Sequence, residues 1–174
     1  MRIAITPTEK EVFFREEDMI VSKTDLKGRL TYVNHEFCRI ANYTEAELLG
    51  KPHSVIRHPD MPRAVFKLLW DTILEGREIF AYVKNMTKSG DYYWVLAHVT
   101  PSYDENKQVV GYHSNRRIPD REVLKNTIVP LYSEMLREEN QHSNGKKSLI
   151  AGFDCLSNWL KSKGKPYDEF IFSL

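Results

Sequence analysis

The segment IFAYVKNMTKSGDYYWVLAHVTPSYD, residues 79–104, decides the fold, because it holds two runs of β-branched and aromatic residues around a short polar turn. The runs at 79–87 and 92–103 have the length and composition of strands, and the intervening Lys-Ser-Gly-Asp is typical of a hairpin connection. A third run of this kind, QVVGYHSNRR, follows at 108–117. The pattern predicts an antiparallel meander of three strands.

Two shorter strand candidates, at 19–24 and 29–33, precede this meander and are separated by an Asp-Leu-Lys-Gly turn. Apolar residues at helical spacing follow at 35–43, and Thr44 then forms a capping box with Glu47 at the start of another short helix. These elements predict a second hairpin and two short helices ahead of the meander.

A longer helix is expected from about Met61 to Glu75, after the stretch RHPDMP, with Asp60 as its N-cap. Charged residues recur every four positions along it in one narrow stripe, and apolar residues cover the rest of its surface. The whole order of elements indicates an α+β fold in which short helices cover one face of a five-stranded antiparallel sheet.

The character of the sequence changes after Pro119. Residues 121–138 and 148–161 show helical spacing on either side of a polar linker, and Pro130 is expected to kink or interrupt the first of these helices. The apolar end of the chain needs a surface to cover it, either the domain's own or a partner's. The chain is therefore expected to divide into an N-terminal cap at 1–18, a sheet-bearing domain at 19–120 and a helical C-terminal extension at 121–174.

The length and charge of the chain limit its organisation and its partners. A chain of 174 residues has room for one domain and a modest appendage. Its 25 basic and 24 acidic residues are spread along the sequence, so a net charge of +1 provides no electrostatic footprint for nucleic acid or an anionic membrane. We expect neither as a partner.

The two cysteines, Cys38 and Cys155, are far apart and lack the spacing of a disulfide framework or a metal cluster, which favours a reducing cytoplasm. Pro7 and charged residues interrupt the N-terminus before a signal-type apolar core forms, and no window approaches 18 apolar residues. We expect a soluble, cytoplasmic protein without a bound metal.

Two polar residues on the predicted strands attract attention. Alternation along 79–87 points Asn85 inward, where a primary amide must either satisfy itself near the strand end or bind something that answers both its donor and its acceptor. Along 108–117, the same counting places Gly111 and His113 on one face, which would make His113 a titratable donor near the space left by small residues of the neighbouring strand.

The polar stretch ahead of the longer helix contains more than a helix cap requires. Capping explains Asp60, and the two prolines explain a rigid entry into the helix, but neither role requires Arg57 or His58. Arg57, the amides of a helix start and a nearby imidazole together would suit a phosphate or the polar edge of a ring system.

These stretches carry a resemblance to a known family. Residues 32–70, YVNHEFCRIANYTEAELLGKPHSVIRHPDMPRAVFKLLW, followed by the segment at 79–104, resemble the FAD-binding PAS domains of bacterial aerotaxis receptors, over about residues 19–120. The resemblance implies a PAS fold and noncovalently bound FAD. It also implies a set of cofactor-binding residues: Asn34, Arg57, His58, Asp60, Trp70 and Asn85.

The sequence departs from this family at one position that bears on the cofactor. Flavin-binding relatives often carry tryptophan where this chain has Ile79, so stacking on a flavin must come from elsewhere, for example from Phe80. The strands are also similar to those of LOV photosensors, but the photoactive cysteine of those proteins aligns with His53. A flavin–cysteine photoadduct is not expected.

The resemblance also suggests a partner. Aerotaxis receptors continue into a membrane anchor and a methyl-accepting signalling module, whereas this sequence ends at Leu174. The arrangement is similar to the stand-alone CetB-type proteins of bipartite energy taxis. It implies a redox sensor that signals through a separate membrane-bound methyl-accepting transducer, located in the cytoplasm or held at the membrane by that partner, with a homodimer as a further option.

Two alternatives stay open. A haem-binding PAS gas or redox sensor would take an axial nitrogen from His53, His58 or His113, and a cofactor-free PAS interaction module would fill its pocket with side chains. An enzyme is not expected, because the sequence has no Walker loop, no Gly-x-Ser-x-Gly elbow, no zinc ligand pair and no kinase motif.

Overall fold

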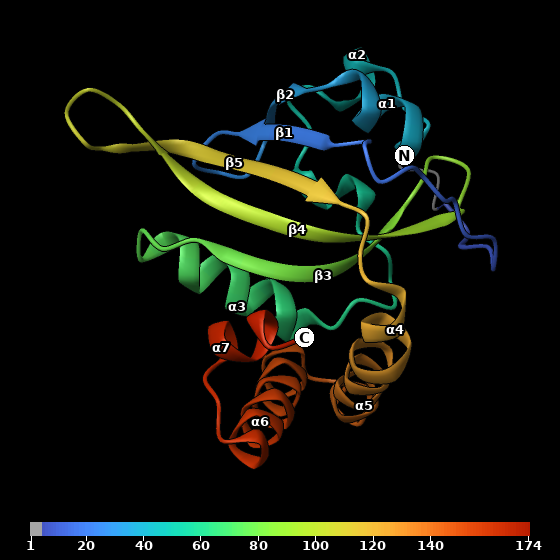
Figure 1. The fold of residues 1–174 in the computed structure, drawn as a ribbon, viewed down its shortest axis with the longest axis vertical. Coiled ribbons are helices and arrows are strands. Elements are labelled where there is room, and N and C mark those ends of the chain that lie inside the picture. The colour runs from blue at the N-terminus through green and yellow to red at the C-terminus, as the bar shows by residue number, and fades with distance from the viewer. Residues whose placement is uncertain (1–4) are drawn as a thin grey trace.

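The β-branched and aromatic runs form a five-stranded antiparallel sheet in the computed structural model, which describes residues 5–174. The first four residues of the expected N-terminal cap therefore lie outside the described residues. The spatial order is β2-β1-β5-β4-β3, as the labels in Figure 1 show. The strands are β1 (Ile20–Thr24), β2 (Leu30–Val33), β3 (Ile79–Met86), β4 (Tyr92–Tyr103) and β5 (Val109–Arg117).

The segment between β2 and β3 crosses one face of this sheet. It forms α1 (His35–Ala41), α2 (Glu45–Leu48), the 3₁₀ turn η1 (His53–Ile56) and α3 (Arg63–Leu74). Apolar residues of these helices and of the inner sheet face make a continuous core. The capping box of Thr44 and Glu47 is present. The predicted α+β class and the five-stranded antiparallel sheet with helices are confirmed.

The start of α3 differs from the prediction. The helix begins at Arg63, and Pro62 occupies the cap position without a side-chain cap. Asp60 is exposed and forms a 2.9 Å salt bridge with Lys84, so the prediction that it is the N-cap was wrong. A carboxylate 75 residues away, on Glu139, accepts from the first helical amides instead, and a local pattern does not reveal such a contact.

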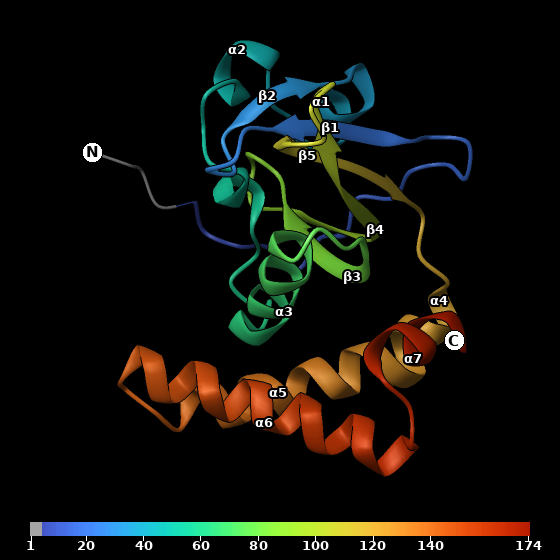
Figure 2. The ribbon, with the colours of Figure 1, turned by 90° about the vertical axis from the view of Figure 1, so that its left-hand side faces the viewer.

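The C-terminal extension forms a helical layer beside β3 and α3. It contains α4 (Arg121–Val123), a π turn at Leu124–Ile128, α5 (Val129–Asn140), α6 (Gly145–Lys163) and α7 (Tyr167–Phe172). Figure 2 shows α5 and α6 packed side by side below α3. Among residues 5–174, every helix is too short or too polar to span a bilayer.

Pro130 is accommodated by the π turn in front of it. The amide of Val129 donates to the carbonyl of Leu124, five residues back, and Pro130, which has no N–H to donate, follows this widened turn at the start of α5. The predicted interruption is therefore a widened turn between α4 and α5, and the helical path continues through it.

The extension packs against β3 through two tyrosines, of which Tyr132 is buried and Tyr167 is half-buried. The hydroxyl of Tyr132 donates to the carbonyl of Tyr82 at 2.8 Å, and the hydroxyl of Tyr167 donates to that of Phe80 at 2.9 Å. In α7, Phe170 is buried in the same core. The domain's own surface therefore covers much of the apolar C-terminal end.

Candidate functional site

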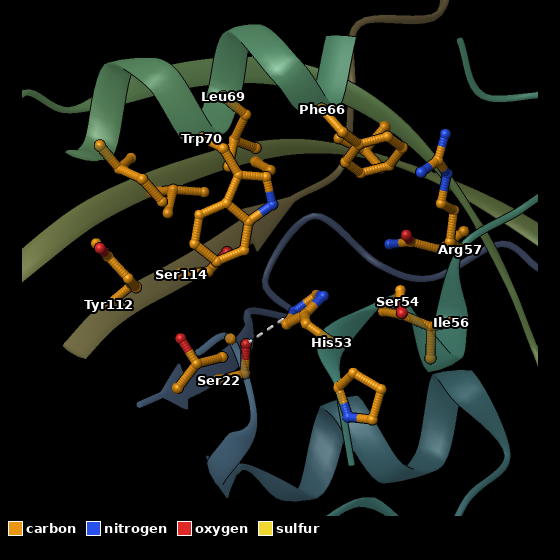
Figure 3. Close-up of a pocket in the computed structure, with 18 of the residues that line it drawn as sticks. Ser22, His53, Ser54, Ile56, Arg57, Phe66, Leu69, Trp70, Tyr112 and Ser114 are labelled. Atoms are coloured by element: carbon orange, nitrogen blue, oxygen red, sulfur yellow. Dashed lines mark hydrogen bonds between the residues drawn. The ribbon is translucent and has the colours of Figure 1, made fainter. Parts of the chain in front are cut away.

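A cavity of about 270 Å³ lies between α3, η1 and the inner face of the sheet. Figure 3 shows side chains from α3 on one side, His53 and Ser22 opposite them, and Arg57 at one end. Its volume lies just below the roughly 300–1,000 Å³ usual for ligand sites. A cavity of this size holds a ring system, with larger ligands extending outside it.

The α3 wall of the cavity is aromatic. Phe66 and Trp70 stand one turn apart on this helix, and both line the cavity. The Trp70 ring meets Tyr112 edge to face, with ring centroids 5.6 Å apart. Gly28 lies under the indole, where a Cβ atom would come within 2.9 Å of the ring, and its φ of +72° suits glycine. The contacts with Tyr112 and Gly28 fix the orientation of the Trp70 ring in the cavity wall.

Arg116 is a buried cation at the opposite side of the cavity. Only 2% of its surface is exposed, and its Nη2 donates to Ser22 Oγ and, at 2.6 Å, to His53 Nε2. Within residues 5–174, Arg116 Nη1 has no hydrogen-bond partner and the guanidinium has no carboxylate within 4.0 Å. Burial lowers the pKa of Arg116 to about 10, so the side chain stays charged at neutral pH.

His53 is held neutral by its surroundings. Loss of water around the ring, followed by the charge of Arg116, lowers the pKa of His53 to about 3. Nε2 accepts from Arg116 and lies 3.3 Å from the hydroxyl of Ser22, so its lone pair is already engaged. The imidazole therefore contributes a fixed polar surface to the cavity.

Asn85 points into the cavity, as the alternation of its strand predicts. Asn85 is 3% exposed, and in the described part of the chain its Nδ2 donates no hydrogen bond, so the chain does not satisfy this donor. Its cross-strand neighbour Tyr93 also has a buried hydroxyl without a partner, and burial raises the pKa of that hydroxyl. Tyr93 does not line the cavity, so Asn85 is the group of this pair that a ligand can reach.

Arg57 closes another side of the cavity. It pairs with Asn85 through the backbone, its guanidinium lies 4.1 Å above the ring of Phe66, and its Nη2 donates to the carbonyl of Met61 at 3.3 Å. Burial lowers the pKa of Arg57. Arg57 thus contacts β3 through its backbone and the start of α3 through its side chain.

The comparisons with known proteins agree with this fold. A family model for the PAS fold matches residues 30–116. This chain belongs to the PAS family. The aerotaxis receptor of Escherichia coli is 38% identical over 129 residues, which cover 74% of this chain and 25% of the receptor. The nitrogen fixation regulatory protein of Klebsiella pneumoniae is 26% identical over 117 residues, covering 66% of this chain and 24% of that protein.

The PAS chain thus spans about a quarter of the length of these curated relatives. Two solved light-oxygen-voltage domains share its fold. One, studied with a flavin analogue, is 16% identical with a TM-score of 0.57 and covers 67% of this chain and 87% of that one. The other, from the photoreceptor Aureochrome1 in its light state, is 19% identical with a TM-score of 0.56, and the match covers 66% of this chain and 91% of that one.

The structure brings together four of the predicted site residues in this PAS cavity. His53, Arg57, Trp70 and Asn85 all line it. Asn34 does not: its Oδ1 accepts from the amides of Val21 and Phe37, and its Nδ2 donates to the carbonyl of Met19. The side-chain amide of Asn34 joins α1 to β1.

His58 and Asp60 lie outside the cavity lining. His58 is 2% exposed, and its Nδ1 accepts from the amide of Asp60 at 3.1 Å. Its ring meets Tyr92 edge to face, while the Asp60 carboxylate binds Lys84. Burial lowers the pKa of His58. These two residues shape the loop that positions Arg57.

The placement of His113 on the cavity face was wrong. Ser114 and Arg116 face the cavity, so alternation turns His113 to the outer face, beside Lys23. The usual rule that polar side chains point outward fails on β5, because the charged Arg116 points inward. Phe80 is also on the outer face, stacked 4.0 Å from His98, so it does not provide the expected flavin stacking.

Several cavity residues were not predicted from the sequence, and Arg116 is the most important of them. Arg116 and Arg117 are adjacent, and the pattern of β5 does not say which of the two faces inward. Ser22 gave no signal either, since a serine on a short strand is ordinary. Phe66 was assigned to the apolar surface of its helix without a role in a site.

Proposed function

We propose that this PAS protein is a cytoplasmic redox sensor that binds FAD noncovalently in the cavity between α3 and the sheet. The observation that carries the proposal is the unpaired Nδ2 of Asn85, buried at the polar end of that cavity. Leaving such a donor unsatisfied costs about 1–3 kcal/mol, so a bound ligand that accepts from it is favoured. The 38% identity to an aerotaxis receptor supports the same function.

The donor set fits a flavin. The pyrimidine edge of a flavin alternates donors and acceptors, which the two groups of a primary amide such as Asn85 can meet. Arg116 Nη1 offers a second free donor, and the apolar wall of Phe66 and Trp70 suits the faces of a planar ring. FAD is larger than the cavity, so its remaining part would extend beyond it.

The residues of the chain would hold and sense the cofactor. FAD supplies reversible electron-transfer chemistry when bound. Arg116, held against the neutral His53, is a fixed positive charge on the side of the cavity opposite α3, and it would stabilise negative charge that a bound flavin gains on reduction. The aromatic α3 wall would help to exclude water from the bound ring. A change of charge next to Asn85 and Arg116 would then bias the packing of β3, β5 and α3.

The alternatives are less well supported by the same geometry. A haem iron needs a free histidine nitrogen, but His53 Nε2 is engaged by Arg116, and His58 and His113 do not line the cavity. A cofactor-free module would leave the buried donors of Asn85 and Arg116 unpaired. Neither alternative accounts for the polar end of the cavity.

The proposal extends to the organisation of signalling. Residues 19–120 would be the PAS sensor, with 1–18 as its cap and 121–174 as the output extension. The sensor would act, as a monomer or a homodimer, on a separate membrane-bound methyl-accepting transducer. Fractionation of cells with and without the candidate transducer tests this step: the protein should move from the membrane fraction to the cytosol when the transducer is deleted.

The cofactor is tested by purifying the protein in air and without oxygen, recording the visible spectrum and identifying any pigment released on denaturation. We expect FAD that bleaches reversibly on reduction. A haem spectrum would replace the proposal with a haem sensor. A protein that stays colourless after incubation with FAD would contradict it in favour of an interaction module.

A further inference from the structure

Glu139, in the last turn of α5, is a buried acid without a cationic partner. Only 3% of it is exposed, and within residues 5–174 no Lys, Arg or His nitrogen comes within 4.0 Å of it. Its two carboxylate oxygens accept from the amides of Arg63 and Ala64, each at 2.9 Å. The C-terminal extension therefore supplies the missing N-cap of α3.

The extension is shaped around this contact. A Cβ atom on Gly152 of α6 would lie 2.3 Å from Glu139 Oε1, so only glycine leaves room for the carboxylate. A Cβ atom on Gly145 would lie 3.1 Å from Arg63 Nη1, so the first turn of α6 also approaches α3 closely. A buried carboxylate is costly unless it is hydrogen-bonded, and the amides of a helix start meet that need.

The capped helix forms the wall of the cofactor cavity. Phe66 stands two residues after the capped amide of Ala64, and Arg57 stacks on it. Arg57 also donates to the carbonyl of Met61, at the entrance to α3. Burial lowers the pKa of Arg57, and the negative charge of Glu139 works against that lowering. Glu139 is thus linked to the cavity through both the helix and the charge of Arg57.

We infer that Glu139 is a positioning residue of the cofactor site, through which ligand binding in the cavity and docking of the α5–α6 pair strengthen each other. The inference rests on the proposed binding of FAD. Glu139 holds the start of α3 in place and keeps Phe66 and Arg57 against the cavity. Coupling between two binding events is reciprocal, so a ligand that fixes α3 also fixes the carboxylate that α3 holds.

The test compares FAD affinity and amide hydrogen exchange in the full-length protein, the variant Glu139→Gln and the control Tyr132→Phe. Tyr132→Phe removes a different hydrogen bond between the extension and the sheet, one that does not reach α3. We expect Glu139→Gln to weaken FAD binding by about 5-fold or more, the lower limit of typical coupling. Tyr132→Phe should bind FAD within about 2-fold of the wild type.

Hydrogen exchange distinguishes coupling from a purely structural cap. FAD should slow exchange at Arg63 and Ala64 and in α5 and α6 of the wild type. That ligand-dependent protection should be lost from α5 and α6 in Glu139→Gln and kept in Tyr132→Phe. If Glu139→Gln fails to fold, Gly152→Ala crowds the same carboxylate and should have the same effects.

The failure of the inference differs from the failure of the proposed function. A wild-type protein that binds FAD without any change of exchange in α5 and α6 would overturn the inference alone. A folded Glu139→Gln variant with wild-type FAD affinity would do the same. A wild-type protein that binds no FAD would contradict both the inference and the proposed function.

Discussion

Among single residues, Asn85 provides the main support for the proposed binding of FAD. Because its Nδ2 has no partner within the described chain, Asn85→Ala removes no internal hydrogen bond from that donor. We expect FAD affinity to fall by about 10-fold or more, while the stability of the ligand-free protein changes by less than about 1 kcal/mol. Fluorescence titration and urea unfolding measure the two effects.

Asn115→Ala is the matched control for this variant. Asn115 pairs with Val21 across β1 and β5 and points to the outer face of the sheet, away from the cavity. It should leave FAD affinity unchanged. Equal losses of affinity in the two variants would contradict a direct contact between Asn85 and the cofactor.

His53 determines part of the dependence of stability on pH. Its pKa is about 3 in the folded protein, against an ordinary value of 6.5, so the unfolded chain binds more protons between these values. The stability that the folded protein gains from a neutral His53 is fully present above pH 6.5 and is lost as the pH falls towards 3. The free energy of unfolding should decline by up to about 1.4 kcal/mol per pH unit from this group.

Urea unfolding of the ligand-free protein at pH 7 and pH 5 measures this loss. The variant His53→Gln keeps an acceptor for Arg116 but cannot titrate, so its stability should fall less between the two pH values. His58 and His113, whose pKa values are also lowered by burial, titrate in both proteins and cancel in the comparison. An identical decline in both proteins would show that His53 is charged or solvated in the fold.

At the scale of secondary-structure elements, Gly28 is where the turn between β1 and β2 contacts the helix α3. Gly28→Ala combines the strain of a positive φ with a clash against Trp70, whereas Gly50→Ala, at φ +74°, has only the strain. We expect Gly28→Ala to be less stable than Gly50→Ala by about 1–3 kcal/mol, the usual cost of overpacking. It should also weaken FAD binding, because the displaced indole lines the cavity.

Urea unfolding of both glycine variants separates strain from clash. The double variant Gly28→Ala/Trp70→Phe provides a control. Its smaller ring relieves the clash, so it should recover part of the stability that Gly28→Ala loses. Equal stabilities of the two single variants would mean that Trp70 moves aside without cost and does not define the cavity wall.

At the scale of the whole molecule, the C-terminal extension and the PAS domain share one hydrophobic core. Leu131, Tyr132 and Met135 of α5 are buried against the domain, and Tyr82 of β3 is covered in return. Truncation after Asp120 should expose this surface, lower the free energy of unfolding by several kcal/mol and promote association of the fragment.

A shorter truncation after Gly164 removes only α7 and should cost less, since Phe170 and Ile171 are the buried residues lost. Size-exclusion chromatography and urea unfolding of the two fragments test this order. A fragment ending at Asp120 that is monomeric and as stable as the full chain would show that the extension does not belong to the folding unit.

Local pattern predicted the fold well because strand alternation, turn residues and helix caps act between neighbours in sequence. The five strands, the capping box of Thr44 and Glu47 and the inward direction of Asn85 all follow from such rules. The π turn before Pro130 and the helix α7 were not predicted; α7 packs on β3, a contact that a local pattern does not show. The start of α3 was misplaced because Glu139, distant in sequence, accepts from the first amides of the helix.

The sequence by itself determined the class of fold, the resemblance to FAD-binding PAS domains and four of the residues that line the cavity. Tertiary structure alone decided that Arg116 faces inward, that His113 faces outward and that Glu139 caps α3. The physical reason is that a charged side chain is buried only where distant groups compensate it. Ser22 and His53 for Arg116, and the amides of α3 for Glu139, are separated from them by tens of residues and meet only in the folded chain.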